Sequence, residues 1–311
     1  MTKKIPWLAV YGFGAHIKST HDKLIVLQKG RSEEYPLQDI RHLLIVGGHT
    51  VSSTTVSHLM KNGSYLSFFD PDGTPVGSVR PPHGNGMDHE IHRLQEELPQ
   101  QRYAIKIAQA TLHSHLVAIG KFQALCDRDL LYAGELDILH NALDEFEYLV
   151  KMDEIRRLSN LTSKMYYEIM ARIIPEKFNF KQRTVRPLSD PVNAMLSFGY
   201  AMLYGNCMIA VIGSHLDPDC GLLQEGPGAL VKDLIHPFTS GMIDPEVCRI
   251  ARSTLTAQDY EQTATRCMLT DLRIKELIGT FKETIDNGKI DNQVQNYLNA
   301  LQKTDDFTVL Y

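Results

Sequence analysis

The residues best suited to chemistry in this sequence are acids and histidines in its last third. Asp233 and His236 stand three residues apart, a spacing that puts both on one face of a helix. A carboxylate and an imidazole so arranged could ligate a metal ion, with His215 or Asp219 completing the set. The alternative is a local role, in which Asp233 caps or pairs within its own segment and His236 is a partly buried polar residue.

A second candidate is a basic stretch, because residues 151–186 hold nine Lys or Arg against four acids. A guanidinium binds phosphate well, since it can donate two parallel hydrogen bonds. The arginines of interest are Arg156, Arg157, Arg183 and Arg186. The competing interpretation is a solvated surface of ion pairs with nearby glutamates. The net charge of the whole chain, −5, does not by itself indicate a nucleic-acid binder.

Residues 1–82 are predicted to form a small β-rich domain. Short runs rich in β-branched and aromatic residues predict strands at 7–11, 23–28, 42–46 and 64–69, and a short helix over 53–61. The glycines at 12, 14, 47 and 48 are predicted to lie in turns. Prolines and glycines between Arg80 and Met87 indicate a linker, assigned to residues 83–100. Four acids between Asp88 and Glu97 indicate that this segment is exposed.

Residues 101–311 are predicted to form a larger all-α domain, which makes the fold class α+β. Apolar residues recur every three or four positions from 105 to 122, as on one long amphipathic helix. A helix capped by Asp190 and started by Pro191 is well signalled. Further helices are predicted at 155–173, 228–236, 245–254, 257–265 and 267–284. The tail from Lys303 is expected to be loosely ordered.

Composition narrows the class of protein. The sequence shows no apolar run near the roughly 20 residues of a membrane span, and no apolar secretion signal at its start. The five cysteines are scattered, without a Cys-x-x-Cys pair, which favours free thiols. We therefore expect a cytoplasmic protein that does not bind membranes.

Short motifs follow one another in a defined order. Arg183 and Arg186-Pro187 precede Asp190-Pro-Val-Asn-Ala-Met-Leu-Ser-Phe-Gly-Tyr200, and Leu216-Asp-Pro with Gly221-Leu-Leu precedes Asp233-Leu-Ile-His-Pro-Phe238. At this spacing they resemble the catalytic domain of the CRISPR adaptation integrases, the Cas-one family. Tyr11-Gly-Phe-Gly and Phe69-Asp-Pro-Asp-Gly follow the family order in the first part of the chain.

The resemblance implies a β domain that makes a homodimer and a helical domain that faces DNA and cuts and joins it with Mg or Mn. The family's three ligand positions fall on Ser159, Gln224 and His236, so only Asp233 keeps the family's residue type. Neutral oxygens do not offset the desolvation of a dication, and a histidine nitrogen suits Zn or Ni better than Mg. The family's lysine and asparagine on the preceding helix fall on His115 and Ala118.

The chain is therefore predicted to be a degenerate, catalytically inactive family member that needs no cofactor. It would bind protospacer or CRISPR-repeat DNA, or act as an architectural subunit, with the Cas-two protein or an active paralogue as partner. One alternative is an active metal-dependent endonuclease and integrase that uses displaced ligands. Another alternative is a protein that no longer binds DNA and binds another protein instead.

Overall fold

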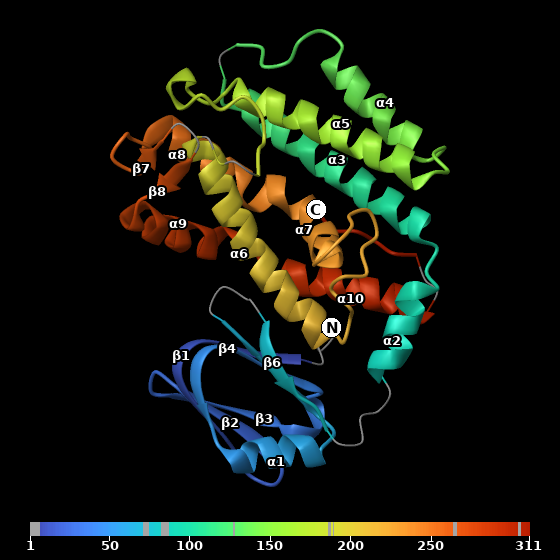
Figure 1. The fold of residues 1–311 in the computed structure, drawn as a ribbon, viewed down its shortest axis with the longest axis vertical. Helices are drawn as coiled ribbons and strands as arrows, with labels where there is room; N and C mark the ends of the chain where they lie inside the picture. The colour runs from blue at the N-terminus through green and yellow to red at the C-terminus, as the bar shows by residue number, and fades with distance from the viewer. Residues whose placement is uncertain are drawn as a thin grey trace.

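The computed structural model describes residues 7–70, 75–81, 87–126, 128–185, 188, 190–263, 266–303 and 306–311. As predicted, the chain is α+β. Figure 1 shows a β-sheet with one covering helix at one end and a larger helical part at the other. The candidate chemistry lies in the helical part, whose long helices position it.

The N-terminal sheet has the order β3-β2-β1-β4-β5-β6. Its strands are β1 (Trp7–Ser19), β2 (Lys23–Gln28), β3 (Arg31–Pro36), β4 (His42–Val51), β5 (Tyr65–Phe69) and β6 (Pro75–Val79). The pairs β1·β4 and β4·β5 are parallel, and the other pairs are antiparallel. Helix α1 (Ser53–Lys61) crosses between β4 and β5, and a short 3-10 helix, η1 (Leu37–Asp39), precedes β4.

The central strand β4 is buried on both faces, which explains its unbroken apolar run. Leu43 and Ile45 pack in the cluster that includes Leu59 of α1, whereas Leu44 and Val46 pack in the main core with the helical part. The alternation follows from the two-residue period of a strand. The sheet is therefore covered by α1 on one face and by the helical part on the other (Figure 1).

The paired glycines lie inside strands, so their prediction as turns was wrong. Gly12 and Gly14 belong to β1 and Gly47 to β4, all with positive φ, and Gly12 is the register partner of Gly47. A Cβ on Gly47 would stand 2.1 Å from the backbone oxygen of Gly12. Here glycine permits a close approach of two strands, a use that the sequence does not distinguish from a turn.

The second part of the chain is mainly helical. Its helices are α2 (Met87–Glu96), α3 (Gln100–Ala124), α4 (Glu135–Phe146), α5 (Met152–Ala171), η2 (Glu176–Phe178), α6 (Pro191–Gly213), α7 (Ala229–Met242), α8 (Asp244–Ser253), α9 (Asp271–Thr284) and α10 (Asn287–Lys303). The predicted cap of α6 is confirmed, because the Asp190 side chain accepts a hydrogen bond from the backbone N–H of Asn193.

Two features of this part correct the sequence-based expectation. Of the predicted helix 257–265, the described residues 257–263 are not helical: β7 (Tyr260–Gln262) pairs with β8 (Cys267–Leu269), so the part is not all-α. Strands of three residues are too short for a periodicity to reveal, and this hairpin is held by a long-range bond from Cys267 N–H to the Leu188 carbonyl at 2.7 Å. The tail is also docked, since Phe307 is buried and stacks on Tyr103.

The predicted linker, residues 83–100, contains helix α2. Ile91 and Gln95 on this helix are buried, so the expectation of an exposed segment was wrong there. The Gln95 side chain donates to the Asp217 carbonyl and accepts from the Asp217 N–H. The division into domains at residues 82 and 100 stays a prediction.

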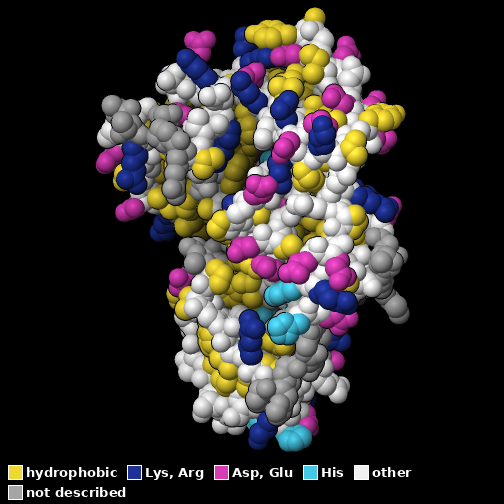
Figure 2. Space-filling model, turned by 45° about the vertical axis from the view of Figure 1, so that its right-hand side comes forward, with side chains coloured by type: hydrophobic (Ala, Val, Ile, Leu, Met, Phe, Trp, Pro, Cys, Tyr) yellow, Lys and Arg dark blue, Asp and Glu magenta, His cyan; other side chains and the backbone are white. Residues whose placement is uncertain are grey.

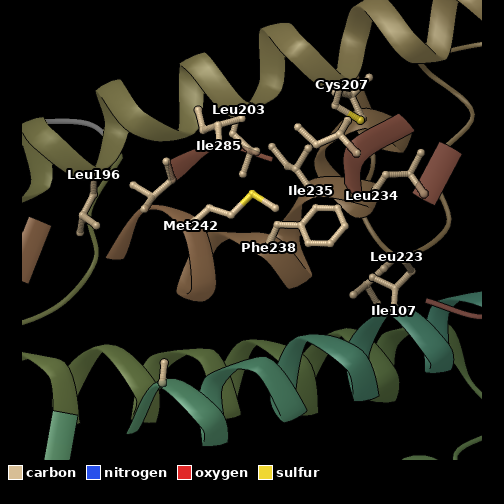
Figure 3. Close-up of a cluster of buried hydrophobic side chains, with 14 of the residues drawn as sticks. Ile107, Leu196, Leu203, Cys207, Leu223, Leu234, Ile235, Phe238, Met242 and Ile285 are labelled. Atoms are coloured by element: carbon tan, nitrogen blue, oxygen red, sulfur yellow. The ribbon is translucent and has the colours of Figure 1, made fainter. Parts of the chain in front are cut away.

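Helix α6 runs through the core of the helical part. Figure 3 shows Leu203 and Cys207 of α6 meeting Ile235 and Phe238 of α7. By length and hydropathy α6 would pass for a membrane span, so the expectation that no apolar run approaches that length was wrong. More than half of this apolar window, 56%, is buried inside the protein, as in the core helix of a globular domain.

Candidate functional site

A cavity of about 260 Å³ lies where α5 meets the segment that leads into α7. It is lined by Arg156, Ser159, Asn160, Leu223, Gln224 and Glu225. Two of the positions expected from the resemblance, Ser159 and Gln224, therefore face the same cavity although they are far apart in sequence. Ser159 comes from the buried face of α5, which packs against α3.

Asp233 lies behind this cavity and points its carboxylate at the backbone. Its oxygens accept hydrogen bonds from the N–H groups of Leu222, Leu223 and Gln224, at 2.7, 2.9 and 3.0 Å. Burial raises the pKa of Asp233 to about 6, against the opposing effect of these three donors. Asp233 thus has the local role considered above: it holds the 222–224 turn that forms one wall of the cavity.

His236 follows on the same helix but contacts a different group of residues. Its ring meets the ring of His115 edge to face, with centroids 6.2 Å apart, and His115 stacks on Tyr166 at 4.0 Å. Burial lowers the pKa of His236 to about 4 and that of His115 well below its usual value. Both imidazoles are therefore neutral at pH 7 and lie within an aromatic cluster.

The two residues that could have completed a metal site lie elsewhere. His215 stacks on His42 at 5.1 Å and lines a separate cavity where the sheet meets the helical part, a region in which histidines gather (Figure 2). The Asp219 carboxylate accepts from the Gly228 N–H at 2.7 Å. Across the described segments, no three or more His, Cys, Asp or Glu residues are arranged to hold a metal ion.

Arg156 crosses the wall of the cavity. Its Nε donates to the Leu223 carbonyl at 2.8 Å, and its Nη1 lies 2.7 Å from Oε1 of Glu225. A weaker approach of 3.7 Å joins Nη1 to Asp153. The cavity therefore presents one fixed guanidinium and several neutral polar groups, with an acid paired to the guanidinium at its edge.

The other predicted arginines are not gathered around this cavity. Arg183 donates to Asn193 Oδ1 at 3.1 Å and to Ser197 Oγ at 2.9 Å, so it is held against the start of α6. Arg157 is exposed on α5, and Arg186 lies outside the described residues. Among the nearby glutamates, Glu154 pairs with Lys151 and Glu168 with Lys164.

A buried polar network was missed at the sequence level. The fully buried Asp244 accepts hydrogen bonds from the hydroxyls of Tyr166 at 2.7 Å and Tyr200 at 2.6 Å, and Tyr167 bonds to Tyr200. Burial raises the pKa of Asp244 to about 7. Asp244 directly precedes a proline, which signals only a helix start, and the three tyrosines come from two other helices.

A family model described as CRISPR associated protein Cas1 matches residues 8–283. The chain is 40% identical over 300 residues to the putative CRISPR-associated endonuclease Cas1 2 of Methanospirillum hungatei, which covers 96% of this chain and 99% of that protein.

Solved structures show the same fold at low sequence identity. A casposase bound to an integration product superposes with a TM-score of 0.83 at 18% identity, covering 99% of both chains. A chain of a partial Cas6-RT-Cas1–Cas2 complex superposes with a TM-score of 0.74 at 19% identity, covering 98% of both chains.

Proposed function

Because the chain belongs to the CRISPR-associated protein Cas1 family, we propose that it is a catalytically inactive member that serves in spacer acquisition as a DNA-binding or architectural subunit. The observation that carries this proposal is that the Asp233 carboxylate binds the protein's own backbone. This acid keeps the family's residue type, although the three ligand positions do not, and its carboxylate is bonded to the N–H groups of residues 222–224.

The residues present do not fit Mg or Mn. These ions need oxygen ligands that carry enough negative charge to offset their dehydration. Ser159 and Gln224 are neutral, and His236 is turned into an aromatic cluster. The guanidinium of Arg156 adds a positive charge to the same cavity, which disfavours a second cation. We therefore propose that no metal cofactor acts here.

The partners proposed follow from the family and from its solved relatives. One superposed structure is a casposase bound to an integration product, and another is part of a Cas6-RT-Cas1–Cas2 complex. We propose that this chain likewise engages protospacer or CRISPR-repeat DNA, dimerises through its β-rich part, and associates with Cas2 or an active paralogue in the cytoplasm. Arg156 and the exposed Arg157 are the described arginines on α5 that support DNA contact.

One observation favours a second candidate, a metal-dependent DNA endonuclease and integrase with displaced ligands. Glu225, next to the substituted Gln224, lines the cavity and could supply a carboxylate if it left Arg156. A metal would still lack a second acid among the lining residues, since Asp233 faces the backbone. The inactive subunit is therefore the better supported function.

The test is cleavage and strand transfer on branched and repeat-containing DNA, with Mg, Mn or EDTA. We expect no turnover from the natural protein. Metal-dependent turnover that is lost in Glu225→Gln would contradict the proposal and establish the displaced-ligand enzyme. A matched triple variant, Ser159→Glu with Gln224→His and His236→Glu, tests whether DNA still binds at this cavity in a reactive position, because restored activity requires correctly bound DNA.

A further inference from the structure

The cavity on α5 has the chemistry of an anion site. Besides Leu223 and the Glu225 carboxylate, its lining groups are the Arg156 guanidinium, the Ser159 hydroxyl and the side-chain amides of Asn160 and Gln224, and these four can donate hydrogen bonds. The arginine is also fixed in place, because its Nε donates to the Leu223 carbonyl at 2.8 Å. A fixed guanidinium with neutral donors around it matches the charge and the oxygens of a phosphate.

Glu225 occupies the position that such an anion would take on the arginine. Its carboxylate oxygen lies 2.7 Å from Nη1, the contact that a phosphate oxygen would make. The two partners differ in freedom: the Glu225 side chain is 74% exposed, whereas that of Arg156 is 26% exposed. The acid can therefore rotate into solvent with little loss of packing, while the arginine stays in place.

The energetic cost of that exchange is small. Ion pairs with one solvent-exposed partner contribute little to stability, because water and salt screen them. A phosphate in a nucleic-acid strand brings further contacts along its backbone and releases counterions, which Glu225 does not do. A strand laid along α5 can thus displace Glu225 from Arg156.

We propose that this cavity binds a backbone phosphate of DNA directly, without a metal ion. In the absence of DNA, the protein's own Glu225 carboxylate occupies Arg156, and the phosphate displaces it. This inference rests on the proposed function, because it names the ligand of the same cavity, a DNA phosphate, and the group that competes with it, Glu225. It makes the cavity an anion site in which an arginine carries the positive charge.

The test is equilibrium binding of a fluorescently labelled branched DNA in EDTA, at several salt concentrations. Arg156→Gln should weaken binding by about tenfold and make the salt dependence shallower by about one released ion. Glu225→Gln should act in the opposite direction and tighten binding several-fold, because the competing carboxylate is gone. Since Glu225 is exposed, this second variant is expected to fold normally.

The chain offers a matched control pair on α8. Arg249 Nε lies 2.7 Å from Glu246 Oε2, the same separation as in the pair at the cavity. Arg249→Gln and Glu246→Gln change the net charge by the same amounts as the test variants. They should leave DNA affinity nearly unchanged, so any general effect of charge is measured separately.

Three results would overturn the inference: DNA binding that disappears in EDTA, an Arg156→Gln effect no larger than that of Arg249→Gln, or no tightening by Glu225→Gln beyond Glu246→Gln. Inorganic phosphate distinguishes the source of the anion. One further result would refute the DNA assignment: phosphate raises the melting temperature only when Arg156 is present, while Arg156→Gln leaves DNA affinity unchanged. The cavity would then be a site for free phosphate. These outcomes are separate from metal-dependent cleavage, which would contradict the proposed function.

Discussion

Two buried aspartates show how neighbouring groups decide what a single residue does. Asp233 receives three backbone N–H donors and holds a turn, whereas Asp244 receives two tyrosine hydroxyls from other helices. Burial raises the pKa of both carboxyls, to about 6 and about 7. At this scale Asp233, the acid that keeps the family's residue type, is structural because its oxygens are already bonded.

The raised pKa of Asp244 should make the stability of the protein depend on pH. The pKa is 3.8 in an ordinary aspartate and about 7 in the fold, so between these values the native state keeps a proton that the unfolded state releases. Stability should therefore fall as pH rises from about 4 to 7, by up to about 4 kcal/mol from this residue.

Asp244→Asn should reduce that fall, because an amide does not titrate. Urea denaturation at several pH values between 4 and 8 measures the effect, and Asp153→Asn, at a side chain that is 91% exposed, is the control. An unchanged pH dependence in Asp244→Asn would show that this carboxyl is not the group responsible. Asp233 would still contribute in the same direction up to pH about 6.

At the scale of elements, the contact between β1 and β4 depends on glycine. Gly47 has a φ of +99° and lies opposite Gly12, whose backbone oxygen would be 2.1 Å from an added Cβ. A backbone atom within a paired strand cannot move aside as a flexible side chain can. The parallel pairing at the centre of the sheet therefore requires the absence of a side chain at this position.

Gly47→Ala should destabilise the protein by about 2–3 kcal/mol, from backbone strain and the steric clash together. Gly77→Ala in β6 is the matched control, because a Cβ there meets nothing within 4 Å. Its effect should stay within about 0.5 kcal/mol. Denaturation midpoints of both variants measure the difference, and equal losses would refute the role assigned to the Gly12–Gly47 contact.

At the scale of the whole molecule, α6 joins the sheet to the helical part. An added Cβ on Gly213, the last residue of α6, would stand 2.9 Å from Leu44 Cδ1 and 3.0 Å from Trp7 Cγ. These side chains come from β4 and β1 and belong to the main core. The two parts are thus packed together through a residue small enough to let a helix end approach the sheet.

Gly213→Val should loosen this junction and cost about 1–3 kcal/mol through overpacking. The chain has a single tryptophan, Trp7, so tryptophan fluorescence reports on the surroundings of this junction. We expect a red-shifted native emission and a lower denaturation midpoint. Gly120→Val on α3, where a Cβ meets nothing within 4 Å, should leave the emission unchanged. An identical emission in Gly213→Val would contradict the close approach.

The sequence by itself determined the α+β class, the strands of the sheet's apolar centre, the capped start of α6 and the family, because these depend on local patterns and on the order of motifs. It missed β3, whose residues Arg31-Ser-Glu-Glu-Tyr-Pro36 carry no apolar alternation, and it missed the hairpin of β7 and β8. Such elements form only through pairing with neighbours.

Only the tertiary structure decided how the candidate site is built. Ser159 and Gln224 line one cavity, whereas His215 lines another. The Asp233 carboxylate accepts hydrogen bonds from the backbone. The tertiary structure also paired Arg156 with Glu225, residues 69 positions apart that no spacing rule connects. The physical reason is that ligation and ion pairing depend on direction and burial, and these are properties of the packed chain.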